Sequence, residues 1–342
     1  MDFSRFLLPV WLCLFGVTGA VQANGGLVQR GDYLQREDVR LFVRDLQAEG
    51  FPAARAEAML AQAVRQQKVL DLIQRPAEGK PWNEYRDIFV TDRRIKGGVR
   101  FWNENEKWLR LARERYGVPE EIMVGIIGVE TFYGAQMGQH KVFDALVTLS
   151  FDYPPRSPFF TKELKNFLLL TQEEPIDPFG VQGSYAGAMG MGQFMPSSYR
   201  AYAVDFDGDG RRDLWRSAAD GIGSVANYFK VHGWVAGEPV VAPARVAGDA
   251  YLNLEANNRK PSYALAELKR AGISPEASIG EHERLVFMNL EGVDGSEFWI
   301  GHQNFYVITQ YNHSVKYALA VYQLAEAIKQ QRQQQAAWSN TR

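Results

Sequence analysis

One apolar segment, Pro119 to Gly134, constrains the fold more than any other part of the chain. Pro119 can occupy the first turn of a helix, and two acidic residues follow it where the helix dipole favours negative charge. Gly134 can close the C-terminus of that helix. Three apolar residues recur at the spacing of one helical face: Ile122, Ile126 and Val129. The segment therefore predicts a helix with an apolar face that ends close to Glu130.

The remaining patterns predict a mainly helical fold with a small embedded β-containing region. Apolar residues at helical spacing indicate helices over Asp92–Arg115, Asp144–Phe151, Thr161–Thr171, Ser197–Val204, Asp220–His232, Ser262–Ala271 and Val315–Lys329. Short β-type runs between glycine and aspartate turns occur at Pro239–Val241, Arg284–Met288 and Glu297–Ile300.

The N-terminus has the pattern of a secretory signal peptide over residues 1–23. Arg5 precedes an apolar run from Phe6 to Val17, and small residues follow that run. An uncleaved anchor or a buried helix is the alternative reading. The only cysteine, Cys13, lies in the apolar run, so its removal would leave a chain without disulfides or cysteine-ligated zinc.

Composition limits the class of protein and of partner. The 342 residues are 46% hydrophobic and 23% charged, which is ordinary for a globular protein and argues against broad disorder. The formal net charge is only -2, so no strong positive field points to nucleic acid as a partner.

Glu130 is the leading candidate for chemistry. It lies near the end of an otherwise apolar helix, where desolvation would raise its pKa and keep it protonated at neutral pH. A general acid needs that property. The alternative is a glutamate at a helix end whose side chain simply reaches solvent.

A glycine-rich segment, Gly183 to Pro196, is the second unusual feature. So many glycines allow close backbone approach and positive φ angles. Gln193, its polar tip, can both donate and accept hydrogen bonds, as amide-bearing sugars require. The alternative is a glycine-rich turn packed against a helix.

An aspartate-rich loop resembles the opening of an EF-hand. Asp205, Asp207 and Asp209 occupy positions 1, 3 and 5, and Gly210 occupies position 6. Position 12, which should be a bidentate glutamate, is Arg216. The alternative is a solvated aspartate–glycine turn.

Three ordered motifs carry a resemblance to a known family. They run from Gly128 to Gly134, from Gly187 to Ser198 and from Gly223 to Phe229. Together they closely resemble the lytic murein transglycosylase B family, and the resemblance extends from about Asp38 to Ile328. It implies a lysozyme-like catalytic core flanked by helical and small mixed regions.

This resemblance implies a division of the chain into consecutive parts. A helical N-terminal region over residues 24–118 would pack on a lysozyme-like core over 119–236, which contains the EF-hand-like loop 205–220. A small mixed α/β region would follow over 237–301. A C-terminal helical segment, 302–342, would then return to the core.

The family reaction cleaves the β-1,4 bond between N-acetylmuramic acid and N-acetylglucosamine without water and leaves 1,6-anhydromuramyl ends. The resemblance implies that Glu130 first protonates the glycosidic oxygen and then, as a carboxylate, takes the proton of the muramyl C6 hydroxyl. No cofactor is implied for this chemistry. Asp144 and Asp152 are the nearest other carboxylates along the sequence, and we expect both to be structural.

The resemblance also implies a set of glycan-binding residues: Tyr85, Arg156, Ser184, Gln193, Tyr228, Tyr311 and Asn312. Pro155 stands where relatives tend to have a second arginine, which weakens the assignment of Arg156. For the aspartate-rich loop the resemblance implies a structural Ca²⁺ held by Asp205, Asp207, Asp209, the carbonyl of Arg211 and Asp220, with Asp213 as an auxiliary ligand.

Two other functions stay open at this stage. One is a goose-lysozyme-like muramidase that activates water with the same glutamate, and the other is a non-catalytic glycan-binding scaffold. For the leading hypothesis we expect a periplasmic monomer, soluble after signal cleavage and without a stable membrane anchor. Peptidoglycan strands would be its partner, and the sequence identifies no cell-wall synthesis or division protein.

Overall fold

The computed structural model describes residues 33–74, 80–280 and 283–340. The expected signal peptide, residues 1–23, lies outside these described residues. Contacts divide the described chain into two compact units, each assembled from separate stretches. The first unit contains 80–133 together with 222–280 and 283–340, and the second contains 33–74 together with 134–221.

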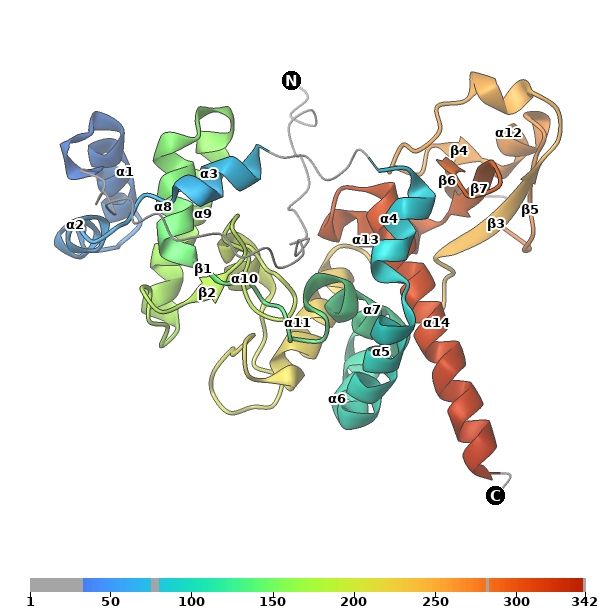
Figure 1. Ribbon diagram of the computed structural model, residues 1–342, viewed down its shortest axis with the longest axis horizontal. Coiled ribbons are helices and arrows are strands. Elements are labelled where there is room, and N and C mark those ends of the chain that lie inside the picture. Colours follow the sequence, from blue (N-terminus) through green and yellow to red (C-terminus); the bar gives the residue numbers. More distant parts are fainter. Residues whose placement is uncertain (1–32, 75–79, 281–282, 341–342) are drawn as a thin grey trace, which may run out of the picture. The chain divides into compact units, whose positions relative to one another are not determined.

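Helices and a short two-stranded sheet build the second unit (Figure 1). Its elements are η1 (Tyr33–Gln35), α1 (Glu37–Ala48), α2 (Ala53–Leu60), α3 (Gln67–Ile73), β1 (His140–Lys141), α8 (Val142–Asp152), η2 (Pro154–Arg156), α9 (Ser157–Glu173), β2 (Gln182–Gly183) and α10 (Pro196–Tyr202). Helices α8 and α9 pack closely against each other. Fully buried aromatic rings fill this core, among them Phe143, Phe160 and Phe167.

The first unit is built around α14, which packs against α4, α5 and α7 (Figure 1). Its helices are α4 (Trp82–Phe89), α5 (Asp92–Glu104), α6 (Glu106–Tyr116), α7 (Glu120–Thr131), α11 (Ala218–Val231, which begins in the second unit), α12 (Leu265–Arg270), α13 (Gln303–Tyr311) and α14 (Val315–Asn340). Its strands are β3 (Val241–Val246), β4 (Tyr263–Ala264), β5 (Ile273–Pro275), β6 (Arg284–Glu291) and β7 (Ser296–Gly301), with a short η3 at Ala250–Asn253.

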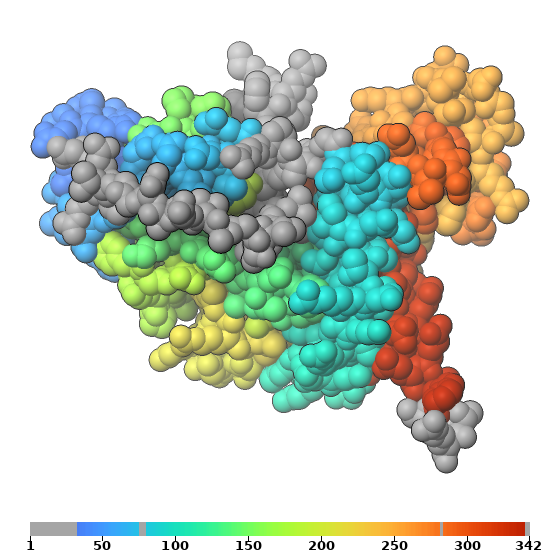
Figure 2. All heavy atoms as spheres, in the orientation of Figure 1, coloured from blue at the N-terminus to red at the C-terminus, as the bar shows by residue number. Residues whose placement is uncertain are grey.

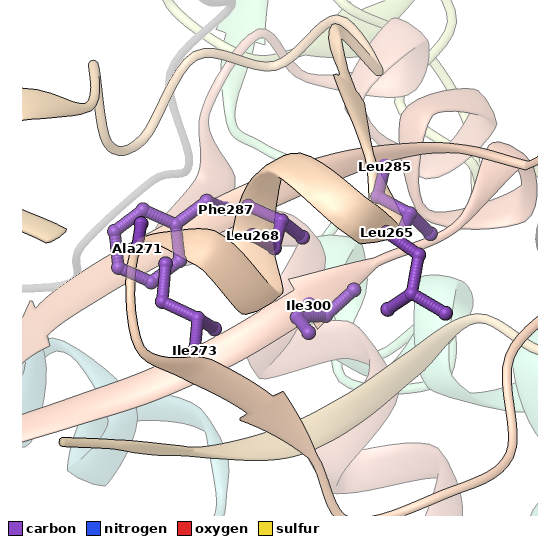
Figure 3. Close-up of a cluster of buried hydrophobic side chains, with 7 residues drawn as sticks. All are labelled: Leu265, Leu268, Ala271, Ile273, Leu285, Phe287 and Ile300. Atoms are coloured by element: carbon purple, nitrogen blue, oxygen red, sulfur yellow. The ribbon is translucent and has the colours of Figure 1, made fainter.

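The five strands of the first unit form one antiparallel sheet in the order β4-β6-β7-β3-β5. Helix α12 lies against this sheet, and the buried side chains between them form a small core of their own (Figure 3). That core consists of Leu265, Leu268, Ala271, Ile273, Leu285, Phe287 and Ile300. In Figure 2 the residues of this sheet and of α12, in orange, gather in one lobe. We call the sheet and α12 together the β-lobe.

The mainly helical fold with a small sheet is confirmed, and most of the expected elements form with shifted ends. One expectation is wrong: Asp92–Arg115 is not a single helix, because α5 ends at Glu104 and α6 begins at Glu106. The Asn105 side chain donates to the carbonyl of Phe101 at 2.9 Å, a local bond that competes with continuation of the helix. Within the described residues, no helix has the combination of length and apolarity that crossing a bilayer requires.

Candidate active site

Helix α7 places Glu130 in its last turn. All of its residues are buried except Glu120 and Glu130, which are half-buried, so nearly the whole helix surface is enclosed. It ends earlier than the sequence suggested, because Phe132 and Tyr133 already adopt left-handed φ angles of 51° and 62° before Gly134 is reached. Left-handed conformations are costly for bulky residues and require support from their surroundings.

Three glycines and an arginine supply that support. A Cβ added to Gly97, Gly98 or Gly128 would come within 2.6–2.9 Å of the Tyr133 side chain, so only glycine leaves room for this ring. The Tyr133 hydroxyl donates to the carbonyl of Arg94 at 2.7 Å. The backbone turn that follows Glu130 is therefore locked in one conformation.

The guanidinium of Arg94 also stabilises this turn through hydrogen bonds. Its Nε donates to the carbonyl of Gly128 at 2.9 Å, and its Nη1 donates to the carbonyl of Ile88 at 2.7 Å. The charged group also lies over the rings of Phe89 and Phe132. Burial lowers the pKa of Arg94. Its charge is satisfied by carbonyls and ring faces rather than by a carboxylate.

The carboxyl of Glu130 is held by a tyrosine from the far end of the chain. The hydroxyl of Tyr317, on α14, donates to Oε1 of Glu130 at 2.5 Å. Desolvation by burial raises the pKa of Glu130 to about 8, and the hydrogen bond from Tyr317 opposes this rise by stabilising the charged form. At neutral pH the carboxyl is therefore mostly protonated, as a general acid must be.

Further tyrosines surround this pair in the first unit. Burial and the nearby Glu130 carboxyl raise the pKa of both Tyr311 and Tyr317, and Tyr85 contributes to the rise at Tyr317. The ring of Tyr228 meets that of Tyr311 edge to face at 4.8 Å, and its hydroxyl donates to the carbonyl of Gln310 at 2.6 Å. Asn312, next along the chain, is buried. Four of the expected glycan-binding residues thus lie in the unit that holds Glu130.

The glycine-rich segment belongs to the second unit. The Gln193 backbone is left-handed with φ 50°, and its amide nitrogen donates to the carbonyls of Met137 and Gly190. Ser184 is fully buried, and its Oγ accepts the backbone N–H groups of Ala186 and Ala188. Both side chains therefore shape this loop themselves. The side-chain carbonyl of Gln193 accepts no hydrogen bond from any described residue.

Arg156 and two carboxylates complete the expected residues of the second unit. The Arg156 guanidinium lies 4.4 Å from the ring centroid of Phe159, and burial lowers its pKa. Asp144 accepts the backbone N–H of Val64 at 2.9 Å. Asp152 accepts the Tyr33 hydroxyl and pairs with two cations, Arg36 and Arg65. The contacts of both aspartates are structural ones.

The aspartate-rich loop brings three carboxylates together. Oxygens of Asp205, Asp207 and Asp209 lie within 4.8 Å of one another, and the loop turns through left-handed glycines at 208 and 210. Asp220 is fully buried and accepts the backbone N–H groups of Phe206 and Asp213, so its oxygens brace the loop. The backbone N–H of Arg211 donates to Asp209. Three clustered carboxylates are a donor set that suits Ca²⁺.

Tyr317 is the one contact of Glu130 that the sequence reasoning missed. Its distance of 187 residues from Glu130 hides the contact from any local pattern. One signal was present: Tyr317 lies on the same face of its helix as Val321, Leu324 and Ile328. A hydroxyl within such an apolar stripe needs a buried partner.

Comparisons with known proteins identify the family of this chain. Residues 35–326 match the family model described as the transglycosylase SLT domain. The chain is 44% identical over 309 residues to membrane-bound lytic murein transglycosylase B of Escherichia coli (strain K12), a match that covers 87% of this chain and 84% of the relative.

Three solved structures are similar over most of their length. Catenated lytic transglycosylase SltB1 from Pseudomonas aeruginosa is 49% identical with a TM-score of 0.84, covering 88% of this chain and all of that one. Lytic transglycosylase Slt35 from Escherichia coli, solved with calcium, is 43% identical with a TM-score of 0.82 and coverages of 90% and 97%. Pseudomonas aeruginosa SltB3, in complex with NAG-anhNAM-pentapeptide, is 30% identical with a TM-score of 0.76 and coverages of 87% and 80%.

The family model spans most of the described chain, and its bounds include both Glu130 and Tyr317. The chain therefore belongs to the transglycosylase SLT domain family, among the lytic murein transglycosylases.

Proposed function

We propose that this chain is a lytic transglycosylase that cleaves the β-1,4 bond between N-acetylmuramic acid and N-acetylglucosamine of peptidoglycan and leaves 1,6-anhydromuramyl ends. The observation that carries the proposal is the Glu130 carboxyl, whose pKa burial raises to about 8 in a chain of this family. The names of the relatives, lytic murein transglycosylases, support the same substrate and reaction.

Glu130 acts twice in the proposed reaction. As an acid it gives its proton to the glycosidic oxygen while the bond from that oxygen to C1 of the muramyl residue breaks. The resulting carboxylate then accepts the proton of the C6 hydroxyl, and O6 forms a bond to C1. Glu130 ends the cycle protonated, and no water is consumed. The Tyr317 hydroxyl supports the carboxylate between the two steps, because it donates to Oε1.

The proposed glycan-binding residues are Tyr85, Tyr228, Tyr311 and Asn312 of the first unit, and Arg156, Ser184 and Gln193 of the second. Tyrosine rings offer apolar faces for sugar rings, and their hydroxyls offer polar contacts. The Gln193 carbonyl is the group in the glycine-rich segment best suited to accept a hydrogen bond from a substrate, since its nitrogen is engaged by backbone carbonyls.

Product analysis tests the reaction. Purified cell-wall sacculi are digested with the enzyme, and the fragments are analysed by mass spectrometry. We expect anhydromuramyl ends, which are 18 mass units lighter than reducing ends because no water is added, roughly one per cleavage. Reducing ends as the main product would contradict this proposal and would indicate a muramidase that adds water to the bond.

The substitution Glu130→Gln tests the role of the carboxyl. It keeps the shape and the hydrogen bond to Tyr317 but removes the transferable proton, so turnover should fall by at least about 10²- to 10⁴-fold. Binding of a glycan fragment, measured by calorimetry, should persist. An unchanged rate would remove Glu130 from the mechanism. An inactive variant that still binds the fragment would show that the unmodified chain is an enzyme and not a scaffold.

A structural Ca²⁺ in the loop 205–220 is the second part of the proposal. The cluster of Asp205, Asp207 and Asp209 supports it, and the relative Slt35 was solved in complex with calcium. In this arrangement Asp220 and the carbonyl of Arg211 are further ligands, and the Asp220 oxygens also accept the backbone N–H groups of Phe206 and Asp213. Melting in calcium and in chelator at low sodium tests it: a higher midpoint in calcium is expected, and equal midpoints would end this assignment.

We place the activity in the periplasm. Peptidoglycan is the proposed substrate, and residues 1–23 have the pattern of a secretory signal peptide. Cell fractionation followed by N-terminal sequencing of the recovered protein tests both points. Recovery of uncleaved protein from the cytoplasm would contradict this location.

A further inference from the structure

The first unit contains a polar cavity that is lined in part by Tyr85, one of the expected glycan-binding residues. Its volume is about 400 Å³, and it opens between α4, the loop that follows η3 and the start of α14. The cavity is lined by Tyr85, Ala256, Val315 and the polar or charged residues Glu255, Asn257, Asn258, Arg259, His313, Ser314 and Lys316. We call it the Arg259 pocket.

The wall that carries Arg259 is held firmly on the β-lobe. Ala256 packs against the hydrophobic core shown in Figure 3. The Asn257 backbone is left-handed, with φ 65°, and its N–H donates to the carbonyl of Phe287 at 2.8 Å. The Asn257 side-chain amide donates to the carbonyl of Asn289 and accepts the N–H of the same residue. These two hydrogen bonds fix the loop to β6. This wall of the pocket is therefore held in one conformation.

Among the described residues, two cations of the pocket form hydrogen bonds only to backbone carbonyls. Lys316 donates from Nζ to the carbonyl of Lys80 at 2.5 Å, and Arg259 donates from Nη1 to the carbonyl of Thr309 at 3.4 Å. Both side chains belong to residues that are half-buried, and neither forms an ion pair with a carboxylate in the part of the chain that the structure describes. The pocket contains one carboxylate, that of Glu255, on an exposed residue.

Unpaired, partly desolvated cations favour an anionic ligand. Burial lowers the pKa of Arg259, because desolvation disfavours the charged form of its guanidinium. A guanidinium and an ammonium in one cavity suit a carboxylate, since both donate strong hydrogen bonds to it. The asparagine side chains of the lining add donors and acceptors for amides. Such a set fits a peptide that carries a carboxylate.

The pocket is joined directly to the groups around Glu130. Lys316 immediately precedes Tyr317, whose hydroxyl donates to Glu130. Tyr85 lines the pocket and also contributes to the raised pKa of Tyr317. The Arg259 guanidinium donates to α13 two residues before Tyr311. The pocket therefore lies beside the groups that surround the candidate acid.

We propose that the Arg259 pocket binds a carboxylate of the stem peptide carried by the muramyl residue, with Arg259 and Lys316 as the recognising cations. This inference rests on the proposed function, because it makes the pocket a specificity site for the same substrate. It gives the enzyme a preference for glycan that still carries peptide over glycan from which the peptide has been removed.

The test compares two ligands on the same proteins. Binding to full-length Glu130→Gln is measured by calorimetry with a disaccharide–pentapeptide fragment and with the same disaccharide lacking the peptide. Adding Arg259→Gln or Lys316→Gln should weaken binding of the peptide-bearing ligand more than that of the bare disaccharide, by roughly five- to twenty-fold per charge. An equal loss for both ligands, or no loss, would overturn the proposal.

Two further variants sharpen the result. Glu255→Gln removes the single negative charge of the pocket, so it should strengthen binding of the peptide-bearing ligand, whereas a neutral peptide pocket would show no gain. Lys260→Gln removes an exposed positive charge that does not line the pocket, and binding of both ligands should stay unchanged. Because Lys316 is only half-buried and Glu255 is exposed, their variants keep the test decisive even if Arg259→Gln fails to fold.

The proposed function can fail separately from this inference. Its own readout is the formation of anhydromuramyl ends by the unmodified enzyme on purified cell-wall sacculi. If those ends do not form while the charge variants still discriminate between the two ligands, the pocket assignment stands and the reaction does not. If the anhydromuramyl ends form but the charge variants do not discriminate between the two ligands, only the pocket assignment is overturned, and the proposed reaction stands.

Discussion

The hydroxyl of Tyr317 donates a 2.5 Å hydrogen bond to Oε1 of Glu130, and it thereby joins α14 to the last turn of α7. Burial makes the Glu130 carboxyl hard to ionise, while the tyrosine makes ionisation easier. A residue that must serve first as an acid and then as a base needs its two forms to be close in energy. This pair of opposing effects provides that balance.

Removal of the tyrosine hydroxyl should shift the pH dependence of the reaction. In the free enzyme Glu130 must be protonated, so kcat/KM should fall as the pH rises through about 8. Tyr317→Phe removes the hydrogen bond that lowers the pKa of Glu130, so this decline should move upward by roughly 0.5–1.5 pH units, with kcat reduced by about ten-fold. Rate profiles between pH 6 and pH 10 measure both effects. Tyr322→Phe, on the same helix, is the matched control, and a profile that does not move would contradict the role of Tyr317.

The buried carboxyl should also make the folded state less stable at high pH. Its pKa is raised on folding, so the folded chain binds more protons than the unfolded chain between the ordinary glutamate pKa of 4.5 and about 8. Stability is therefore lost as the pH rises through this window and levels off above it. Glu130→Gln has no such loss, and its advantage should grow from near zero at pH 4.5 to on the order of 1–3 kcal/mol above pH 8. Thermal melting across this range measures the difference; a constant gap would mean that the carboxyl is not desolvated.

Gly128 should tolerate no side chain. A Cβ at this position would lie 2.7 Å from the ring of Tyr133, so Gly128→Ala must displace the ring that supports the turn after Glu130. We expect a stability loss of about 1–3 kcal/mol and a lower kcat. Gly221→Ala is the control: this helical glycine has ordinary contacts of 3.4 Å and more, so alanine there should be neutral or stabilising. Denaturant unfolding and initial rates decide the comparison.

Arg94 should be irreplaceable by lysine. The flat guanidinium reaches the carbonyls of both Gly128 and Ile88 while its faces contact Phe89 and Phe132, and an ammonium cannot do all of this. Arg94→Lys should cost about 1–3 kcal/mol of stability, because a buried carbonyl loses its donor. The substitution should also lower kcat, because the backbone that positions Glu130 would be held less firmly. Arg100→Lys, at an exposed position of α5, serves as the comparison, and equal behaviour of the two variants would contradict this account.

Local patterns were sufficient to predict most helices, because apolar spacing along a helix reflects the face that it buries. The same reasoning found Glu130, since an apolar helix that ends in a carboxyl is visible within a single segment. It could not find Tyr317 or Arg94, whose roles depend on contacts with residues 187 and 34 positions away. The break between α5 and α6 at Asn105 was also missed, because no glycine or proline marks it in the sequence. A side-chain bond that competes with the helix emerges only in the folded chain.

The distance of 187 residues between Glu130 and its tyrosine also affects how the protein acquires activity. Helix α7 can form early from local contacts, but its carboxyl gains a partner only when α14 docks against it, and such long-range closures come late in folding. A chain emerging from N-terminus to C-terminus therefore carries its acid for most of its synthesis without the group that balances it. Recovery of enzymatic rate during refolding should accordingly lag behind recovery of helical signal, so that activity reports the last docking step rather than the first helices.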